Sequence, residues 1–322
     1  MNAPTHATTA TPPRWQVLAA FAAIYLIWGS TYLAIRFAID TVPPFLMAGT
    51  RFLVAGLLLT GWARLRGAPR AAPRHWASAT LLGFLFLVCG NGGVVWSEQR
   101  LASGLAALLV AIVPVWTVLF DWLRPGGRRP GALVVAGLLI GLAGVAILVI
   151  PGGGTGGAVD LVGALAVIGA TIAWAIAAVS QGSLPLPASP LLATGMEMLM
   201  GGVLLLAVGA AHGELARFHL AAVTPRSALA LAYLIVFGSL VAFTAFVWLL
   251  RVTQPARVAT YAYVNPVVAV LLGWAFAGEA LSARTLVGAG VIVAGVVLIT
   301  TARARAATPA ARAREVPAEV TG

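Results

Sequence analysis

The sequence contains no lysine, a single cysteine and few charged residues of any kind. Charged residues make up 9% of the chain, whereas soluble globular domains carry roughly 25%. The lone Cys89 excludes an intramolecular disulfide and a thiolate metal site. The histidines fall in the N-terminal tail and in loops and form no ligand cluster: His6, His75, His212 and His219. These absences exclude an ordinary soluble domain and lead us to expect no metal and no cofactor.

Apolar residues dominate instead, since 61% of the chain is hydrophobic and the mean hydropathy is +0.98. They form unbroken runs of about 20 residues, long enough to cross a bilayer as helices. A β-barrel would show alternation over about ten residues. The ten predicted spans are 15–37, 45–64, 76–97, 102–122, 131–150, 160–180, 190–210, 227–249, 256–277 and 284–301. The sequence therefore predicts an all-α integral membrane protein with no separate soluble domain.

The excess of positive charge, formally +11, sits in the connections between these runs. This placement argues against a nucleic-acid surface, which gathers basic residues on one face. With the N-terminus inside, fourteen arginines fall on the inner side and five on the outer side, while Arg51 lies within a run. Cytoplasmic loops retain positive charge. We therefore expect a multi-pass inner-membrane protein with both termini in the cytoplasm.

Rare residue types recur at fixed offsets in the two halves of the chain. Trp28 and Trp174 are 146 positions apart, and Pro114 and Pro266 are 152 apart. Further matched pairs are Pro44 and Pro190, Gly49 and Gly195, Gly56 and Gly202, Trp96 and Trp248, Trp122 and Trp274, Gly137 and Gly288, and Gly144 and Gly295. Each half holds five predicted spans, so the second half must enter the membrane from the opposite side. Such an inverted repeat is typical of secondary transporters, because two inverted copies can exchange conformations around a midplane site.

The predicted organisation follows from this repeat. The segment before the first span lacks the basic start and the cleavage site of a signal peptide, so the first span is expected to remain. The divisions are a disordered cytoplasmic N-terminus at 1–14, a first five-helix repeat at 15–150, a Gly-rich periplasmic linker at 151–159, a second five-helix repeat at 160–301 and a disordered basic cytoplasmic tail at 302–322. We interpret the arginines of the tail as a topology signal, with contact to anionic lipid headgroups as the alternative.

Glycines at helical spacing predict close contacts between helices. Gly137 and Gly141 lie four apart in the fifth span, and Gly288, Gly290 and Gly295 lie in the tenth. Small residues let helix backbones approach closely in a membrane. The contacts would form within the monomer or between chains, and the sequence leaves the oligomeric state open.

Two prolines and two amides stand out within the spans. Pro114 and Pro266 fall near the middle of spans four and nine. A proline there frees a helix carbonyl, which needs a partner or a water-filled cavity in a membrane. We weigh a cavity-lining role and a simple packing kink equally. Asn91 and Asn265 also need hydrogen bonds, from neighbouring helices or in a cavity.

Four ionisable residues lie in the spans or at their ends, where charges are costly and often functional. Arg51 has Glu197 as its repeat partner, but inversion places the two at different depths. Glu98, at the outer end of span three, is the better partner for Arg51. Arg251, at the inner end of span eight, is the better partner for Glu197. These pairs would act as gates, bind a charged substrate group or a proton, or only tie helices together, and the last interpretation is slightly favoured.

Several short motifs carry a resemblance to a known family. They are Trp28-Gly-Ser-Thr31, Arg51-Phe52, Trp96-Ser-Glu98-Gln99, Ser103-Gly-Leu-Ala-Ala107, Gly201-Gly202, Phe237-Gly-Ser239, the run from Pro255 to Pro266, and Gly278-Glu279. Through them the chain resembles the drug/metabolite transporter superfamily, in particular its EamA-type ten-helix exporters and their YedA-like members. The resemblance covers roughly 15–301. It implies two inverted five-helix units, with spans 1, 3, 4, 6, 8 and 9 around a central cavity and spans 5 and 10 at the periphery.

The resemblance also implies a set of cavity residues and a function. Carried over by position, the cavity residues are Trp28, Ser30, Asn91, Trp96, Pro114, Trp174, Trp248, Tyr261 and Asn265. The implied function is export of amino acids or related small metabolites by alternating access, with a small-molecule substrate and membrane lipid as partners. One departure from the family pattern is that a Gly-Glu pair is absent after span four, whereas Glu279 is present in the second half. No symmetric role is expected for this acid.

Three other functions are weighed against metabolite export. Multidrug efflux by proton antiport is the alternative within transport, with Glu98 and Glu197 as its candidate carboxylates. A membrane-embedded enzyme is disfavoured, because the spans contain no cluster of paired Asp or His residues. A passive channel is disfavoured because no ring of like charges and no carbonyl filter motif is visible.

Overall fold

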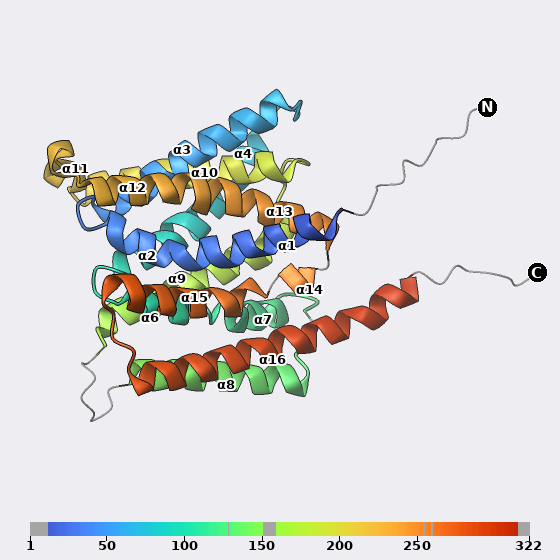
Figure 1. Cartoon of the computed structure of the whole chain (residues 1–322). Coiled ribbons are helices and arrows are strands. Elements are labelled where there is room, and N and C mark those ends of the chain that lie inside the picture. Colours follow the sequence, from blue (N-terminus) through green and yellow to red (C-terminus); the bar gives the residue numbers. More distant parts are fainter. Residues whose placement is uncertain (1–11, 128, 151–158, 254, 259, 315–322) are drawn as a thin grey trace, which may run out of the picture.

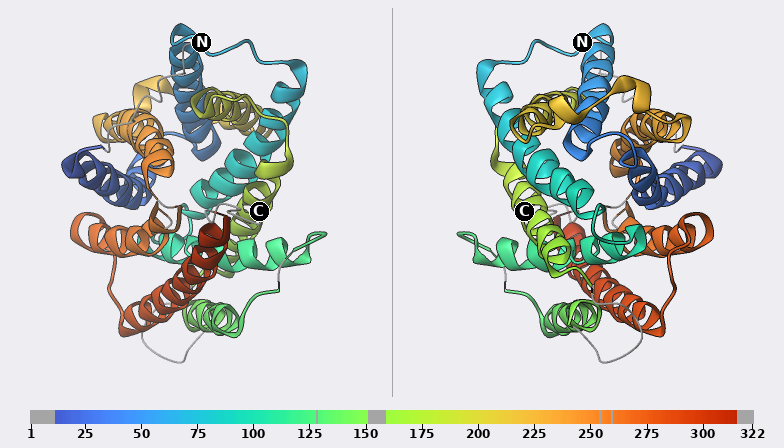
Figure 2. Two further views of the ribbon diagram at one scale, coloured as in Figure 1. Left: turned by 90° about the vertical axis from the view of Figure 1, so that its right-hand side faces the viewer. Right: turned by 90° about the vertical axis from the view of Figure 1, so that its left-hand side faces the viewer.

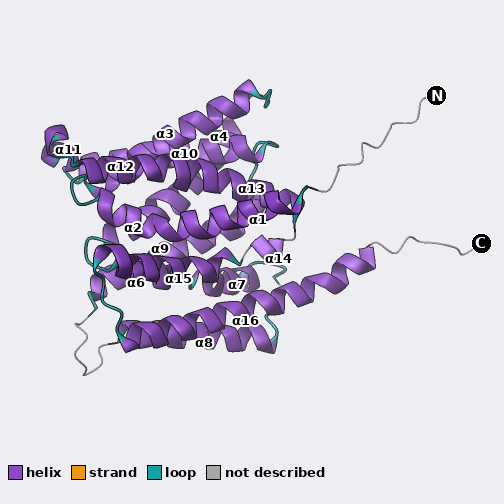
Figure 3. Cartoon of the chain, in the orientation of Figure 1, coloured by secondary structure: helices purple, strands orange, loops and turns teal. Residues whose placement is uncertain are grey.

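Helices account for all the regular structure of the described chain, as Figures 1 and 3 show. The computed structural model describes residues 12–127, 129–150, 159–253, 255–258 and 260–314, and no strand occurs in these ranges. Within them, nine helical stretches are long and apolar enough to cross a membrane, and Tyr261–Ala277 is a shorter apolar helix. The predicted all-α fold with ten spans is thereby confirmed.

The first half supplies spans 1 to 5, and several of these contain more than one helical segment. Span 1 is α1 (Arg14–Ala22), η1 (Ala23–Ile27) and α2 (Trp28–Ala38); span 2 is α3 (Pro44–Leu65); span 3 is α4 (Pro73–Gly83), η2 (Phe84–Gly92) and α5 (Gly93–Ser97); span 4 is α6 (Ser103–Val110) and α7 (Val113–Leu123); span 5 is α8 (Ala132–Val149). Pro44 and Pro73 stand in the first turns of α3 and α4, where a missing N–H leaves no hydrogen bond unmade.

The second half supplies spans 6 to 10. Span 6 is α9 (Leu161–Ser180) with η3 (Gln181–Ser183); span 7 is α10 (Pro190–Ala211); α11 (Glu214–Arg217) and η4 (Leu220–Ala222) lie in the next connection; span 8 is α12 (Pro225–Tyr233), η5 (Leu234–Val241) and α13 (Ala242–Val252); span 9 is α14 (Pro255–Val258) and α15 (Tyr261–Ala277); span 10 is α16 (Ala283–Arg314). Helices α9, α10 and α12 begin at polar caps, where Asp160, Ser189 and Thr224 each accept a hydrogen bond from a first-turn amide.

We name the two ends of the bundle by the chain segments that they carry. The linker end holds Ile150 and Val159, which flank the connection between the halves. The termini end holds Arg14 and the last turns of α16 (Figure 1).

Matched glycines of the two halves form the crossing of α3 and α10. A Cβ added to Gly56 would collide with the backbone nitrogen of Leu199, and one added to Gly202 would collide with that of Leu53. The two glycines are repeat partners of each other, 146 positions apart. The crossing is therefore made by the same sequence feature from each half, as close packing of membrane helices requires.

The pair of α8 and α16 is built in the same way. A Cβ on Gly137 would lie 2.9 Å from the carbonyl oxygen of Gly295, and one on Gly144 would lie 3.1 Å from that of Gly288. The predicted glycine contacts thus form within one chain. Figure 2 shows the two pairs, α3 with α10 and α8 with α16, at opposite edges of the bundle, with the other spans between them.

Matched π-helical segments interrupt spans 3 and 8. Residues Phe84–Gly92 of η2 correspond, at the 152 offset, to 236–244, which overlaps η5 (Leu234–Val241). A π-helical turn leaves the regular hydrogen-bond ladder and is frequent at functional sites. Span 1 carries a further segment of this kind, η1, whereas its repeat partner α9 is continuous.

The tail differs from its predicted state. Helix α16 continues through Arg314, so the expected disorder of 302–322 is wrong for residues 302–314. Alanine and arginine are strong helix formers and extend the last span beyond its apolar part. The remaining predicted segments, 315–322 of the tail, 1–11 of the N-terminus and 151–158 of the linker, lie outside the described residues.

Candidate functional site

Trp28 lies at the centre of an aromatic cluster that joins spans 1, 8 and 9. Its ring centroid is 5.1 Å from that of Tyr261 and 5.2 Å from that of Phe246. Phe243 completes the cluster at 6.3 Å. The indole N–H donates to the carbonyl of Gly238 at 3.1 Å, which fixes the orientation of the ring. Trp28, Phe243, Phe246 and Tyr261, called the aromatic cluster below, form a half-buried apolar surface with the geometry that aromatic rings prefer.

Asn265 connects this cluster to span 1. It is 8% exposed, and in the orientation that its surroundings require, its amide nitrogen donates to the carbonyls of Tyr25 at 3.2 Å and Tyr261 at 3.3 Å. The hydroxyls of Tyr25 and Thr260 also share a hydrogen bond. The amide of Asn265 is therefore satisfied by backbone groups and holds α15 against η1.

Ser30 faces span 8 from the same part of span 1. Its hydroxyl donates to the carbonyl of Ile27 at 2.8 Å, so the hydroxyl of Tyr233, 2.6 Å away, donates to Ser30. This pair ties α2 to the end of α12.

Trp174 and Asn91 lie in spans 6 and 3, away from the aromatic cluster contacts. The ring of Trp174 meets that of Phe86 edge-on at 5.0 Å. A Cβ on Gly90 would lie 2.9 Å from Cε3 of Trp174, so the glycine leaves room for the indole. The Oδ1 atom of Asn91 is buried and has no hydrogen-bond partner within the protein.

The two remaining tryptophans predicted to line the cavity lie in different places. Trp248 packs in the cluster of Leu249 and Val258 beside Trp28. Trp96 lies at the linker end, where the guanidinium of Arg100 sits 4.9 Å from its ring. The structure thus brings Trp28, Trp248, Tyr261 and Asn265 together, whereas Trp174 packs against Phe86 and Trp96 contacts Arg100.

The two matched prolines act differently. Span 4 breaks before Pro114, which stands in the first turn of α7. Pro266 lies buried inside α15, which begins five residues earlier. The symmetry of sequence at this position is therefore not a symmetry of helix geometry.

Arg51 reaches from span 2 across to span 8. It is 5% exposed, and its Nε donates to the hydroxyl of Ser239 at 2.9 Å. Its Nη2 lies 3.2 Å from where a Cβ would stand on Gly238, so the guanidinium packs closely against this glycine. The Nη1 atom is buried and has no hydrogen-bond partner within the protein.

Glu98 follows α5 at the linker end and is fully buried. Its backbone carbonyl accepts a hydrogen bond from Nη1 of Arg36 at 3.0 Å. Both carboxylate oxygens have no hydrogen-bond partner within the protein. Burial, reinforced by the charge of Glu279, raises the pKa of Glu98 well above its usual range, and Arg36 and Arg51 partly oppose this rise.

Neither predicted ion pair forms a direct contact in this conformation. The ion pairs within 4 Å in the described chain are Arg100 with Asp160 and Arg124 with Asp121. Glu197 accepts a hydrogen bond from the amide of Gln181 at 3.5 Å instead of pairing with Arg251, which is exposed on α13. Charge complementarity and matched depth suggested these pairs, but the reach of each side chain is set by packing that the sequence does not display.

Two carboxylates that the sequence did not assign cap helices of the other half at the linker end. Glu279 accepts from the amides of Ser103 at 2.7 Å and Gly104 at 3.0 Å. Glu214 accepts from the amide of Leu46 at 2.8 Å and from that of Phe45 at 3.3 Å. First-turn amides have no partner inside their own helix, and a carboxylate also favours the positive end of the helix dipole.

Three further polar residues near the predicted site were not singled out from the sequence. They are Tyr32, Tyr233 and Ser239. Tyr32 lies close enough to interact electrostatically with both Glu98 and Tyr261, while Ser239 and Tyr233 contact Arg51 and Ser30. The Phe237-Gly-Ser239 motif marked the position of Ser239, but no pattern indicated its partner.

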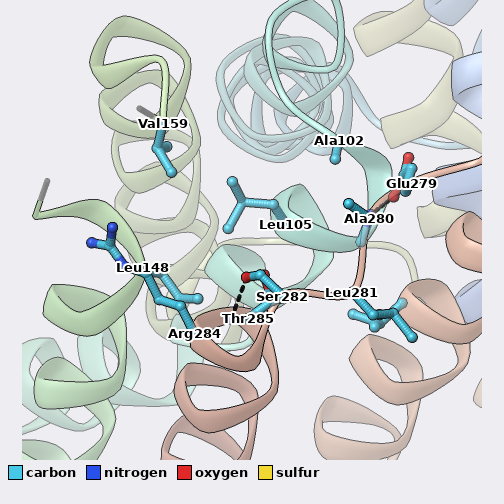
Figure 4. A pocket seen from close by; sticks show the side chains of 12 residues that line it. Ala102, Leu105, Leu148, Val159, Glu279, Ala280, Leu281, Ser282, Arg284 and Thr285 are labelled. Atoms are coloured by element: carbon cyan, nitrogen blue, oxygen red, sulfur yellow. Dashed lines mark hydrogen bonds between the residues drawn. The ribbon is translucent and has the colours of Figure 1, made fainter. Parts of the chain in front are cut away.

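A hollow of about 210 Å³ opens at the linker end, beside Glu279 and the start of α16 (Figure 4). Small and apolar side chains line most of it, and the hydroxyls of Ser282 and Thr285 bond to each other across 2.8 Å. Arg284, at its edge, donates to the carbonyl of Ile147. The lining residues come from the connections around spans 4, 5, 9 and 10, away from the aromatic cluster.

Comparison with known proteins identifies the relatives of this chain. The model of the EamA-like transporter family matches residues 14–150 and again 161–301. The inner membrane transporter YedA of Escherichia coli K12 is 42% identical over 283 residues, covering 87% of this chain and 89% of YedA. A probable terminal-alkyne amino-acid exporter of Streptantibioticus cattleyicolor is 30% identical over 299 residues, covering 88% of this chain and 95% of that protein.

A solved crystal structure shares the fold. It superimposes with a TM-score of 0.59 at 20% identity, covering 90% of this chain and 98% of that chain. At this identity the likeness concerns the fold alone.

Proposed function

Because the chain belongs to the EamA-like transporter family, we propose that it is a secondary transporter that exports amino acids or related small metabolites by alternating access. Its relatives are inner membrane transporters, and transport across the inner membrane is the general activity. Export, the substrate class and the mechanism are the steps that we add.

The observation that carries the proposal is the inverted pair of halves. Matched glycines make both edge pairs, α3 with α10 and α8 with α16, from equivalent positions. The spans between them contain the matched π-helical segments η2 and η5 and the broken fourth span. Continuous, tightly packed helices suit a scaffold, whereas interrupted helices near the midplane suit a substrate site.

The aromatic cluster and Asn265 support a small organic substrate. An apolar wall with a few fixed polar groups is the usual composition of a small-molecule site. The name of the relative from Streptantibioticus cattleyicolor refers to amino-acid export. We therefore place amino acids first among the metabolites to test.

The orientation that we propose puts both termini in the cytoplasm. Fourteen arginines fall on that side against five on the other, as the positive-inside rule requires. The linker end then faces the periplasm.

The test is uptake and counterflow in liposomes that contain the purified protein, screened with pooled radiolabelled amino acids and metabolites. We expect saturable flux of one compound class, accelerated by the same class on the opposite side. Asn265→Ala is expected to abolish this flux, because the amide holds α15 against η1. Gln99→Ala is the matched control, since Gln99 is an exposed amide at the linker end. Flux of no metabolite, together with stabilisation of the protein by many hydrophobic cations, would replace the proposal with multidrug efflux.

A further inference from the structure

Arg51 and Glu98 are the two buried charges whose hydrogen-bonding capacity is least used by the protein around them. Arg51 is 5% exposed and Glu98 is 0% exposed. Nη1 of Arg51 and both carboxylate oxygens of Glu98 have no partner within the protein. Buried polar groups are almost always hydrogen-bonded, and an unsatisfied buried charge is strongly unfavourable. Two such groups of opposite sign, on helices that pack together, need an explanation.

The neighbouring charges do not fill this capacity. Arg36 donates to the backbone carbonyl of Glu98 rather than to its carboxylate. Glu279 lies near Glu98, but its own two oxygens accept from the amides of Ser103 and Gly104. The capacity that remains is therefore that of Nη1 of Arg51 and of the complete carboxylate of Glu98.

The positions of the two charges fit a ligand between them. Helix α3, which carries Arg51, packs against α5, which ends directly before Glu98. The two side chains interact electrostatically but form no ion pair within 4 Å. A separation above 4 Å excludes a direct hydrogen bond between the two groups and leaves them to be joined by a bridging molecule.

The same two charges border the aromatic cluster. Nη2 of Arg51 lies against Gly238, whose carbonyl accepts the indole N–H of Trp28. Tyr32 interacts electrostatically with both Glu98 and Tyr261 of the cluster. A polar head group between the charges would therefore have an apolar surface beside it for a side chain.

We infer that Arg51 and Glu98 form the head-group site of the transporter and bind an α-amino acid as a zwitterion, with the carboxylate on Arg51 and the ammonium on Glu98. Guanidinium groups bind carboxylates through paired N–H donors, and an ammonium supplies three donors for the two carboxylate oxygens. An anion alone would leave Glu98 without a partner, and a cation alone would leave Arg51 without one. A zwitterion satisfies both, and its side chain lies toward the aromatic cluster. The inference rests on the proposed transport function and adds the residues that select the head group.

The test compares amino acids with capped forms that keep the side chain. The probes are phenylalanine, leucine and threonine, each with its amide, which lacks the carboxylate charge, and its N-acetyl form, which lacks the ammonium. Binding is measured by thermal shift of the purified protein, and transport by counterflow in liposomes. We expect at least one free amino acid to bind and move at least about tenfold better than either of its capped forms, as loss of one charge-assisted contact implies.

Two variants assign the contacts. Glu98→Gln is expected to weaken the free amino acid at least about tenfold while leaving the N-acetyl form unchanged or improved, because that form has no ammonium to place. Arg51→Gln is expected to weaken binding of the free amino acid at least about tenfold while leaving the amide form unchanged or improved, because that form has no carboxylate to place. Arg100→Gln and Asp160→Asn are the matched controls, since this ion pair lies exposed at the same end of the bundle, and they should leave the preference intact.

The outcomes separate this inference from the transport proposal. Flux with no preference between free and capped forms would preserve the transport proposal and overturn the head-group site. Flux of no probe and of no metabolite would overturn the transport proposal itself. The wild-type preference decides the matter even if Arg51→Gln fails to fold, and an equal loss of all three forms in Glu98→Gln would reduce Glu98 to a structural residue.

Discussion

The linker end and the termini end of the bundle are held together differently. At the linker end, carboxylates cross between spans: Glu279 caps α6 and Glu214 caps α3. Further contacts between elements at this end are Arg36 to the carbonyl of Glu98, Ser227 to the carbonyl of Phe37, and the amide of Thr224 to the hydroxyl of Thr41. At the termini end, contacts between spans involve other groups: Gln181 donates to Glu197, and the hydroxyls of Tyr25 and Thr260 share a hydrogen bond, while Arg124 pairs with Asp121 three residues away.

Spans 4 and 9 pack against each other at the linker end and have different neighbours towards the termini end. Helix α6 packs against α15, and a Cβ on Gly104 would lie 3.0 Å from the Cα of Val270. Beyond the break before Pro114, α7 packs instead against α9 and α16. Spans 4 and 9 are therefore packed together at the linker end, and we call this packing the closed linker end. With the orientation proposed above, that end faces the periplasm.

The first half has no acid at the position equivalent to Glu279. The position equivalent to Glu279, at the 152 offset, is Gly127. A Cβ on Gly127 would lie 2.6 Å from the carbonyl oxygen of Trp122 and 2.9 Å from that of Arg124, because the chain folds back on the end of α7. No side chain fits there in this conformation. The two halves share an architecture, but only the linker end has this carboxylate cap.

The largest effect is expected from Gly127→Ala, which alters the end of α7. The added methyl group meets backbone atoms that cannot rotate away, so we expect a loss of stability of about 1–3 kcal/mol. Gly131→Ala is the control, because a Cβ there has nothing within 4 Å. The free energy of unfolding in mixed micelles measures both. Equal effects would mean that the fold-back of α7 does not require glycine at 127.

Glu279→Ala would loosen the linker end without altering the termini end. Losing a helix cap costs about 0.5–2 kcal/mol, which corresponds to a population shift of up to roughly 30-fold. We expect a longer distance between spin labels at Gln99 and Phe276, in a Cys89→Ser background, measured by pulsed electron resonance. Glu214→Ala is the matched control. It removes a similar cap, but within the tightly packed pair of α3 and α10, so it should lower the melting temperature and leave this distance unchanged. A distance that is unchanged in Glu279→Ala as well would show that other contacts keep the linker end closed.

The parts of the molecule that depend on composition and period could be predicted from the sequence. Ten spans follow from apolar runs that only a membrane accommodates, and glycines such as Gly137 and Gly295 predicted the close helix contact that α8 and α16 make. These features depend on the residue type and its spacing along the chain. They do not depend on which distant residue it contacts.

The partners of the polar groups could not be predicted. Arg51 was matched with Glu98 by charge and depth, yet it hydrogen-bonds Ser239 on a helix 188 positions away. Matched prolines suggested matched breaks, but span 4 breaks before Pro114 while α15 runs through Pro266. Such details depend on which side chains reach each other after packing. The Gly278-Glu279 motif was visible, but only the structure shows that its acid caps the other half.

The pKa values of Glu98 and Asp160, at the same end of the bundle, are shifted in opposite directions. The amide of Gly163, together with Arg100, lowers the pKa of Asp160, so that residue stays ionised. Burial, reinforced by Glu279, raises the pKa of Glu98, and Arg36 and Arg51 partly oppose this rise; Tyr32 also interacts with Glu98. Lowering the pH through this raised pKa protonates Glu98 and removes the partner of an ammonium group.

Binding of a free amino acid should therefore strengthen as the pH rises, by at most about tenfold per pH unit. Thermal-shift titrations at a series of pH values measure the effect. Glu98→Gln should abolish the dependence and Asp160→Asn should preserve it. A dependence that survives in Glu98→Gln would assign the titration to another group.

The ion pair of Arg100 and Asp160 should contribute least to the closed linker end. Its atoms are 3.3 Å apart, but the side chains are 45% and 34% exposed, so water and salt screen their attraction. Arg100→Gln should leave the label distance between Gln99 and Phe276 unchanged, and added salt should not alter it in the wild type. The part-buried cap of Glu279 is held by hydrogen bonds to two amides and should be screened less. A salt-dependent distance would show instead that exposed charges hold the linker end closed, and the contrast between the two ends would then be one of surface charge rather than of helix capping.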